Sequence, residues 1–213
     1  MKLFSDPPAK HLKVLRMALH LVALLPLVHL LIGNLTGSFG DDALRTVLWE
    51  TGDWSLYFLC ITLAVTPLRR LTRWNWLVSY RRLPGVYAFF YGVLHFGAYL
   101  WLSRSADLLQ LFQKILTSKA LVTGFVCLMI LILLTVTSTR GMFKRLGVKA
   151  WQNLHRLTYF AAVLAVIHYW LEVSRYGSTR PLWIGAIVAL LLLFRVGWSF
   201  YEDYWRLRED RGV

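Results

Sequence analysis

Histidine is the residue type whose placement in this sequence suggests chemistry. His95 and His168 each stand inside a long apolar run, YGVLHFGAYL and AVIHYW. An ionisable side chain at membrane depth is costly and is therefore a functional candidate by default. A neutral imidazole facing the interior of a helix bundle is a common axial ligand of haem iron. We predict that His95 and His168 bind one haem; the simpler alternative is that both only form hydrogen bonds between helices.

The other four histidines are weaker candidates. His155 lies thirteen residues before His168, which is about 20 Å along a helix and about 140° around it. On a straight helix the two imidazole rings would therefore point in different directions and could not both face one haem. His155 either binds a second haem near the membrane surface or contacts a lipid headgroup or a haem propionate. His20 is more typical of a packed, hydrogen-bonded histidine, and His11 and His29 are expected at the interfaces.

Several arginines gather beside the apolar runs and allow two interpretations. They set the topology and meet lipid headgroups, or they bind haem propionates or the phosphate of a flavin nucleotide, because a guanidinium suits bidentate anion binding. The candidates are Arg81, Arg82, Arg140 and Arg156.

The composition decides the class of protein. Of 213 residues, 57% are hydrophobic and only 16% are charged, and uncharged runs of about 20 residues indicate membrane-spanning helices. The sequence predicts an all-α, polytopic membrane protein with a single domain over residues 1–213. The net charge of +13 comes from short basic loops, which argues against a nucleic-acid partner. Cys60 and Cys127 lie in apolar runs and are expected to pack as small residues.

Apolar runs predict a bundle of six spans. Pro26 should kink the first span, and Arg195 should snorkel from the last. Trp151–Tyr169 should form one continuous helix that carries both His155 and His168. The helical spacing of apolar residues over 106–116 predicts a short interfacial helix, and 139–150 reads as a basic loop. The six spans are about 12–33, 48–68, 83–102, 120–138, 154–173 and 182–201.

The basic residues also predict the orientation. With six spans, the side that holds both termini collects sixteen Lys and Arg residues and the other side six. The excess places both termini in the cytoplasm. His95 then lies about 18 Å and His168 about 21 Å from the cytoplasmic surface, so parallel helices offer the two rings at similar depth.

Short motifs along the chain resemble one family. They are RRLPG at Arg81–Gly85, GVLHF around His95, TSTRGM at Thr137–Met142, KRLG at Lys144–Gly147, and W-x-x-L-H-R-L followed by I-H-Y over the fifth span. Together they resemble the MsrQ family, the haem-binding membrane subunits of bacterial periplasmic methionine-sulfoxide reductases. That family belongs to the ferric-reductase-like transmembrane group, which includes the NADPH oxidases.

The resemblance implies a six-helix protein of the inner membrane that is a non-catalytic redox subunit. It implies one or two b-type haems, with FMN also attributed to the family. Electrons would come from the quinone pool or a cytosolic flavin reductase. They would pass to a periplasmic molybdopterin subunit that reduces methionine sulfoxide in oxidised proteins. By motif, the haem ligands would be His95, His155 and His168. The NADPH oxidases have a fourth histidine where this chain has Arg81.

Two alternatives remain open from the sequence. One is a self-sufficient quinol-dependent ferric or cytochrome reductase. The other is a non-redox, proton-coupled transporter in which the histidines relay protons. No strand, Gly-rich loop and helix unit for a nicotinamide is present in the sequence, so electrons must come from another molecule. We expect a partner to dock on the interfacial helix at 106–116 and the loop at 34–53.

Overall fold

A computed structural model of the chain describes residues 8–103, 107–174 and 177–210. Sequence features at Lys2, Arg104, Arg175 and Arg211 lie outside this part. Within it, all regular secondary structure is helical, which confirms the all-α prediction. The elements are α1 (Ala9–Leu35), η1 (Gly40–Asp42), α2 (Ala43–Thr72), η2 (Asn75–Tyr80), α3 (Arg82–Ser103), α4 (Leu108–Thr117), α5 (Lys119–Thr137), α6 (Arg140–His155), α7 (Leu157–Val173) and α8 (Arg180–Asp210).

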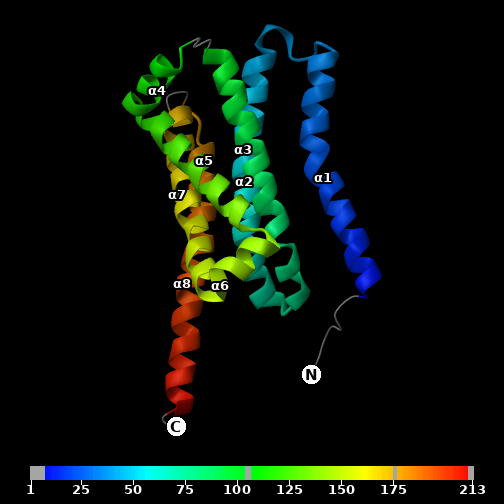
Figure 1. Cartoon of the computed structure of the whole chain (residues 1–213), viewed down its shortest axis with the longest axis vertical. Coiled ribbons are helices and arrows are strands. Elements are labelled where there is room, and N and C mark those ends of the chain that lie inside the picture. The colour runs from blue at the N-terminus through cyan, green and yellow to red at the C-terminus, as the bar shows by residue number, and fades with distance from the viewer. Residues whose placement is uncertain (1–7, 104–106, 175–176, 211–213) are drawn as a thin grey trace.

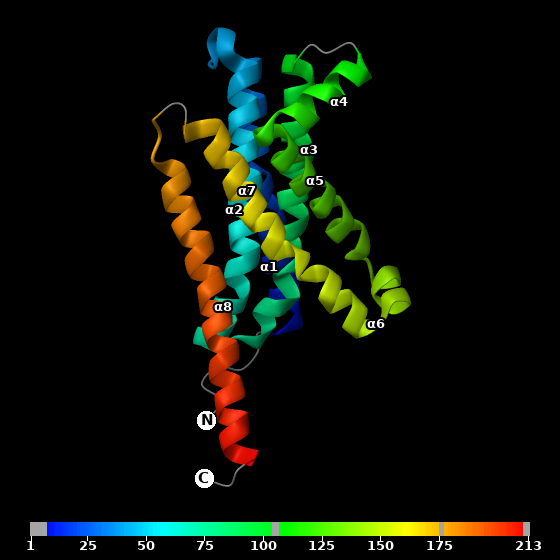
Figure 2. The ribbon, with the colours of Figure 1, turned by 90° about the vertical axis from the view of Figure 1, so that its left-hand side faces the viewer.

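Two tightly packed helix pairs form the centre of the bundle. Helix α2 packs along α3, and α5 packs along α7 (Figures 1 and 2). Helix α8 lies against α2 and α7, while α1 stands at the periphery beside α2 and α3. Helices α4 and α6 lie at opposite ends of the bundle. Helix α1 begins and α8 ends at the same end, as predicted for the two termini.

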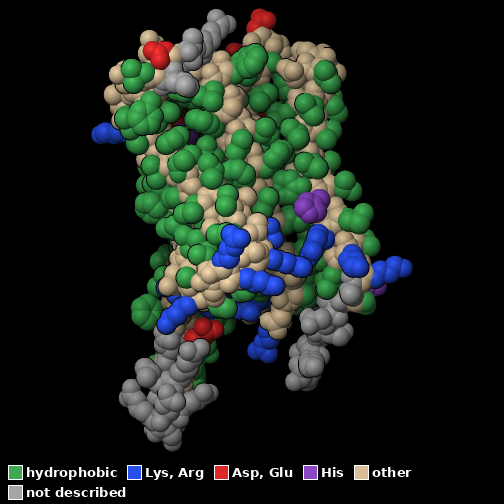
Figure 3. All heavy atoms as spheres, in the orientation of Figure 1, with side chains coloured by type: hydrophobic (Ala, Val, Ile, Leu, Met, Phe, Trp, Pro, Cys, Tyr) green, Lys and Arg blue, Asp and Glu red, His purple; other side chains and the backbone are tan. Residues whose placement is uncertain are grey.

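Within the described residues, four helices are long and apolar enough to cross a membrane: Lys10–Leu35, Asn75–Ser103, Lys119–Thr137 and Arg180–Glu202. Helices α2 and α7 pack beside them, and the count of six spans stays a prediction. A belt of hydrophobic side chains surrounds the visible face of the bundle, and Lys and Arg side chains gather below it at the end where α1 begins (Figure 3). This charge distribution is the one expected of a cytoplasmic end.

Side-chain caps define the connections between helices at both ends of the bundle. The Asp107 carboxylate accepts a hydrogen bond from the Leu109 amide at 2.9 Å and so starts α4, which confirms the predicted short helix; its interfacial location stays a prediction. Thr139 similarly accepts from the Met142 amide at 3.3 Å and starts α6. The prediction of a loop over 139–150 was therefore wrong. Helix α6 contains one non-helical residue, Gly147, at φ 74°.

The predicted continuous helix over Trp151–Tyr169 was also wrong. Helix α6 ends at His155 and α7 begins at Leu157. At the junction the Arg156 amide bonds to the Asn153 carbonyl at 3.2 Å, and the Tyr159 amide bonds to the Arg156 carbonyl at 3.0 Å. These three-residue steps wind the chain more tightly than an α-helix, so helical spacing cannot be carried from His155 to His168.

Tyrosine hydroxyls of α3 attach α1 to the bundle. The fully buried Tyr91 donates to the Ala23 carbonyl at 2.8 Å and accepts from the Leu27 amide at 3.2 Å. Its hydroxyl therefore bridges the two groups that would otherwise pair within α1, next to Pro26. A side chain inserted beside a proline is a known cause of helix kinks.

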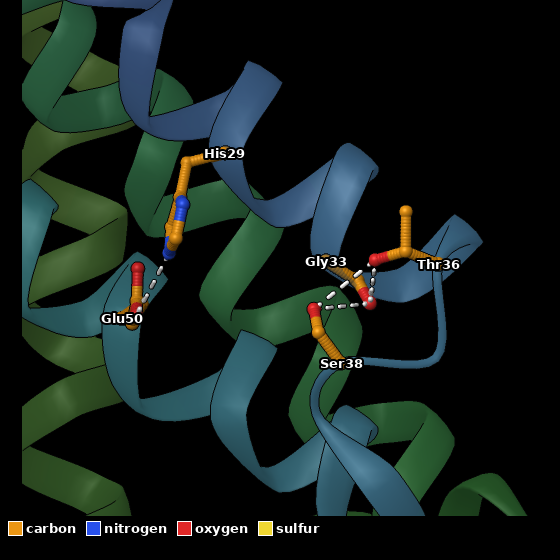
Figure 4. A network of polar contacts seen from close by, with 5 residues as sticks. All are labelled: His29, Gly33, Thr36, Ser38 and Glu50. Carbon is orange, nitrogen blue, oxygen red and sulfur yellow. Dashed lines mark hydrogen bonds and ion pairs between the residues drawn. The ribbon is translucent and has the colours of Figure 1, made fainter.

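Polar contacts also join α1 to α2 at the end of the bundle where α1 ends and α2 begins, which we call the outer end. His29 of α1 lies 3.8 Å from Glu50 of α2, and the hydroxyls of Thr36 and Ser38 donate to the Gly33 carbonyl (Figure 4).

Arg195 is directed into the bundle, which differs from the expected snorkelling. Its guanidinium donates to the Leu63 carbonyl at 3.0 Å and to the Thr66 hydroxyl at 2.9 Å, both on α2. It also donates to the Tyr159 hydroxyl of α7. Because these carbonyl and hydroxyl oxygens face inward, the arginine joins α8 to both neighbouring helices.

Candidate functional site

His95 and His168 meet inside the bundle. His95 comes from α3 and His168 from α7, and their ring centroids lie 5.9 Å apart with the ring planes at 80°. The two residues are far apart in the chain, and the parallel course of α3 and α7 brings them to the same depth. The structure thus places together the two histidines that the sequence singled out.

Each of the two rings is held by a carbonyl of the neighbouring helix. The Nδ1 atom of His95 lies 2.8 Å from the Leu48 oxygen of α2. The Nδ1 atom of His168 lies 2.8 Å from the Ala120 oxygen of α5. Because a carbonyl oxygen only accepts hydrogen bonds, each Nδ1 must carry the proton. A neutral ring with its proton on Nδ1 keeps the Nε2 lone pair for a metal, and such a carbonyl bond is the usual support of a ligating histidine.

Two glycines make room for these rings. A Cβ atom at Gly52 would lie 2.9 Å from Nδ1 of His95, and one at Gly124 would lie 2.8 Å from Nδ1 of His168. Each glycine follows its ring's carbonyl acceptor by four residues, so Leu48 and Gly52 on α2 repeat the arrangement of Ala120 and Gly124 on α5.

The sequence analysis did not single out either glycine. The third span itself carries Gly85, Gly92 and Gly97. Of these only Gly92 lines the cavity beside the histidines. A usable signal was present in the spacing: His95 follows Gly52 by 43 residues, and His168 follows Gly124 by 44.

A cavity of about 490 Å³ contains both histidines. Cavities of this size are typical of cofactor sites. Its inner part is apolar, and its polar and charged lining lies toward the outer end, where α2 begins and α3 and α7 end. The apolar lining includes Leu56, Phe96, Leu121, Phe125, Leu128 and Leu131. The polar residues at the outer end include Arg45, Asp53, Tyr99, Tyr169 and Glu172.

His95 and His168, whose ring centroids lie 5.9 Å apart, would be the residues that hold a haem iron here. Among the residues that the structure describes, no group of three or more His, Cys, Asp or Glu side chains could hold a bare metal ion. Two axial ligands and an apolar slot are what a porphyrin iron requires.

His155 does not reach this cavity. Its ring stacks on Trp151 with centroids 3.8 Å apart. Its Nδ1 lies 3.1 Å from the Trp151 carbonyl, and its Nε2 lies 3.2 Å from the Ser138 hydroxyl. The Ser138 hydroxyl also donates to the Leu134 carbonyl at 2.7 Å, so both ring nitrogens of His155 already have polar neighbours within the protein.

The candidate arginines also lie away from the cavity. Arg81 follows η2, Arg82 opens α3, and Arg156 stands between α6 and α7. None of the three is part of the cavity lining among the described residues, and neither is Arg140 at the start of α6. Arg82 and Arg156 are exposed. These positions agree with a headgroup role, and a flavin phosphate at this end would lie far from the His95–His168 pair.

Comparison with known proteins identifies relatives across most of the chain. The family described as "Ferric reductase like transmembrane component" matches residues 51–166, which include His95 and end two residues before His168. A "Protein-methionine-sulfoxide reductase heme-binding subunit MsrQ" from Herminiimonas arsenicoxydans is 43% identical over 92% of this chain and 90% of its own. The protein of the same description from Ralstonia nicotianae is 41% identical over 90% of this chain and 88% of its own. No solved structure matches.

Proposed function

The chain belongs to the MsrQ family within the ferric-reductase-like transmembrane group, and from this premise we propose that it carries electrons across the membrane through a haem between His95 and His168. The observation that supports this most directly is the pair of rings in one cavity, each with Nδ1 held by a carbonyl and with no hydrogen bond to Nε2 among the described residues. Iron held there would supply a one-electron carrier.

The protein's own groups would give that carrier its properties. The carbonyls of Leu48 and Ala120 fix the tautomer and orientation of each ring and raise its basicity as a ligand. The apolar lining keeps water away and lowers the local dielectric. Since both rings are fixed by neighbouring helices before any cofactor binds, little rearrangement should accompany a change of iron charge.

We further propose that the electrons leave toward a periplasmic molybdopterin reductase subunit, which repairs methionine sulfoxide in oxidised proteins. The relatives' description as subunits of a methionine-sulfoxide reductase supports such a partner. The cavity's polar lining and α4 lie at the end opposite the start of α1 and the end of α8. The basic residues at that other end support its being the cytoplasmic one. The protein would then be a non-catalytic subunit of the inner membrane.

Finer points of the proposal concern cofactors and the electron donor. The haem would be of b type, because the two rings are non-covalent ligands and the described cysteines, Cys60 and Cys127, lie inside helices. A second haem at His155 would need that ring to give up its bond to Ser138. The donor would be the quinone pool or a cytosolic flavin reductase, and FMN would bind at the cytoplasmic end, where Arg81, Arg82 and Arg156 lie.

The proposed docking surface can be tested on α4. Leu109, Phe112 and Leu116 are more than half exposed there, while Ile115 is buried against the bundle. Replacing Leu109 and Phe112 with Glu should lower electron delivery to the partner at least roughly tenfold, because such anchors dominate interfaces. The haem spectrum should stay unchanged. Gln113→Glu adds one negative charge at an exposed polar position of α4 and is the control for each single substitution, Leu109→Glu and Phe112→Glu; equal delivery by all three variants would refute the surface.

The two alternatives predict different results. A self-sufficient quinol-dependent reductase would reduce a ferric or cytochrome acceptor without the partner subunit. A proton-coupled transporter would purify as a colourless protein. Under either alternative, substitutions on α4 would not lower electron delivery to a partner while leaving the haem spectrum unchanged.

A further inference from the structure

The Tyr99 hydroxyl is a buried polar group without a hydrogen-bond partner among the described residues, and it lies in the wall of the histidine cavity. Phe96 stacks beside its ring. A buried hydroxyl left unpaired costs about 1–3 kcal/mol, so native structures rarely keep one without a reason. The group is therefore positioned for something that enters the cavity.

The position of Tyr99 relates it directly to the haem ligand. It follows His95 by four residues on α3, so both side chains lie on one face of the helix, with Tyr99 about 6 Å nearer the outer end. The edge of a porphyrin whose iron is bound by His95 would reach the next helical turn of α3, where Tyr99 lies. The groups at a porphyrin edge that accept a hydrogen bond are its propionate carboxylates.

The charges around Tyr99 support the same orientation. Arg45 lines the cavity at the start of α2, and the Lys114 ammonium of α4 lies 5.9 Å from the centre of the Tyr99 ring. The inner part of the cavity offers apolar side chains such as Leu128 and Leu131, against which a carboxylate could not be solvated. Propionates are therefore favoured at the outer end.

Two carboxylates of the protein also line this end and must be considered. Asp53 pairs with Arg180 at 3.9 Å, so its charge is partly balanced. Glu172 follows His168 by four residues, as Tyr99 follows His95, and it acts electrostatically on Tyr99. A propionate near Tyr99 would be repelled by Glu172, which predicts that neutralising Glu172 strengthens haem binding.

We propose that the Tyr99 hydroxyl and Arg45 form a carboxylate-binding subsite for the haem propionates, at the outer end of the cavity. This inference rests on the proposed function, because it needs a haem between His95 and His168. It orients the propionate edge toward α4, the proposed docking side. It also replaces the arginines at the other end of the bundle, Arg81, Arg82 and Arg156, as propionate partners of this haem.

The test compares haem with haem dimethyl ester, in which the propionate charges are removed. The purified full chain would be loaded with each porphyrin, and the rate of porphyrin loss to an excess of apomyoglobin would be measured. Tyr99→Phe should speed the loss of haem by roughly tenfold or more, the value of a hydrogen bond to a charged group. It should change the loss of the ester much less, because an ester carbonyl is an uncharged and weaker acceptor than a carboxylate. Arg45→Gln should act in the same direction, and Glu172→Gln should slow the loss of haem.

Tyr87→Phe is the matched control, because the Tyr87 hydroxyl bonds to His20 of α1 at 3.0 Å and lies outside the cavity lining. Equal effects of Tyr99→Phe on haem and on the ester would overturn the subsite, as would an unchanged rate with haem for both Tyr99→Phe and Arg45→Gln. A wild-type chain that bound neither porphyrin would instead refute the proposed function.

Discussion

At the scale of single residues, the site depends on what surrounds the two imidazoles as much as on the imidazoles themselves. His95 and His168 receive their orientation from carbonyls of α2 and α5. Gly52 and Gly124 let the rings approach those helices. A histidine in an apolar helix is easily recognised in a sequence. The carbonyl that holds it lies on another helix 47 or 48 residues earlier, and the glycine that makes room for it lies 43 or 44 residues earlier.

Alanine at either glycine should therefore weaken haem binding. A Cβ at Gly52 or Gly124 would lie within 3 Å of a ring nitrogen, so the ring would have to move. Overpacking of this kind costs about 1–3 kcal/mol, which would raise the haem dissociation constant by roughly five- to a hundredfold. Haem titration of the purified apoprotein measures this.

Gly97→Ala serves as the control for both substitutions, because a Cβ there would meet nothing within 4 Å. If Gly52→Ala and Gly124→Ala bound haem as tightly as Gly97→Ala, the glycines would not determine the position of the rings.

At the scale of helices, polar side chains join elements that apolar packing alone would leave loosely attached. Tyr91 reaches across to α1 beside Pro26, and Arg195 joins α8 to α2 and α7. Inside a membrane the apolar effect between helices is absent, so such hydrogen bonds and close packing carry more of the association.

Arg195→Gln should therefore destabilise the attachment of α8. Hydrogen bonds that involve a charged group contribute about 1.5–3 kcal/mol, and the Leu63 carbonyl and Thr66 hydroxyl would lose their guanidinium partner. We expect a lower midpoint of thermal unfolding in detergent. Lys149→Gln removes a positive charge from an exposed position of α6 and controls for net charge. A shared midpoint for the two variants would show that Arg195 contributes no more than a surface lysine.

Most of the helices, but not all of them, could be predicted from the pattern of apolar residues in the sequence. Apolar periodicity located α4 to within two residues, and the apolar runs fell inside α1, α2, α3, α5 and α8. The pattern did not reveal α6, whose basic residues resemble a loop and whose helix is interrupted at Gly147. Nor did it reveal the tight turn at Arg156, because a one-residue change in winding leaves the apolar pattern unchanged.

At the scale of the whole molecule, the chain has two similar halves around one cavity. Each half supplies one helix that carries a histidine of the pair and one helix that carries the glycine beside it. These are α3 with α2 in the first half and α7 with α5 in the second. The sequence predicted the two histidines and their equal depth, because helical rise alone fixes those. It did not predict the polar outer end of the cavity. Arg45, Tyr99 and Glu172 are brought together only when α2, α3 and α7 are packed.

The central claim is that His95 and His168 together hold one haem. The direct measurement is the reduced-minus-oxidised visible spectrum of the purified full-length protein, with His95→Ala, His168→Ala and His155→Ala prepared beside it. We predict a b-type spectrum for the wild type, its loss in His95→Ala and in His168→Ala, and at most a partial loss in His155→Ala. A colourless wild-type protein, or full haem content in both His95→Ala and His168→Ala, would contradict the account.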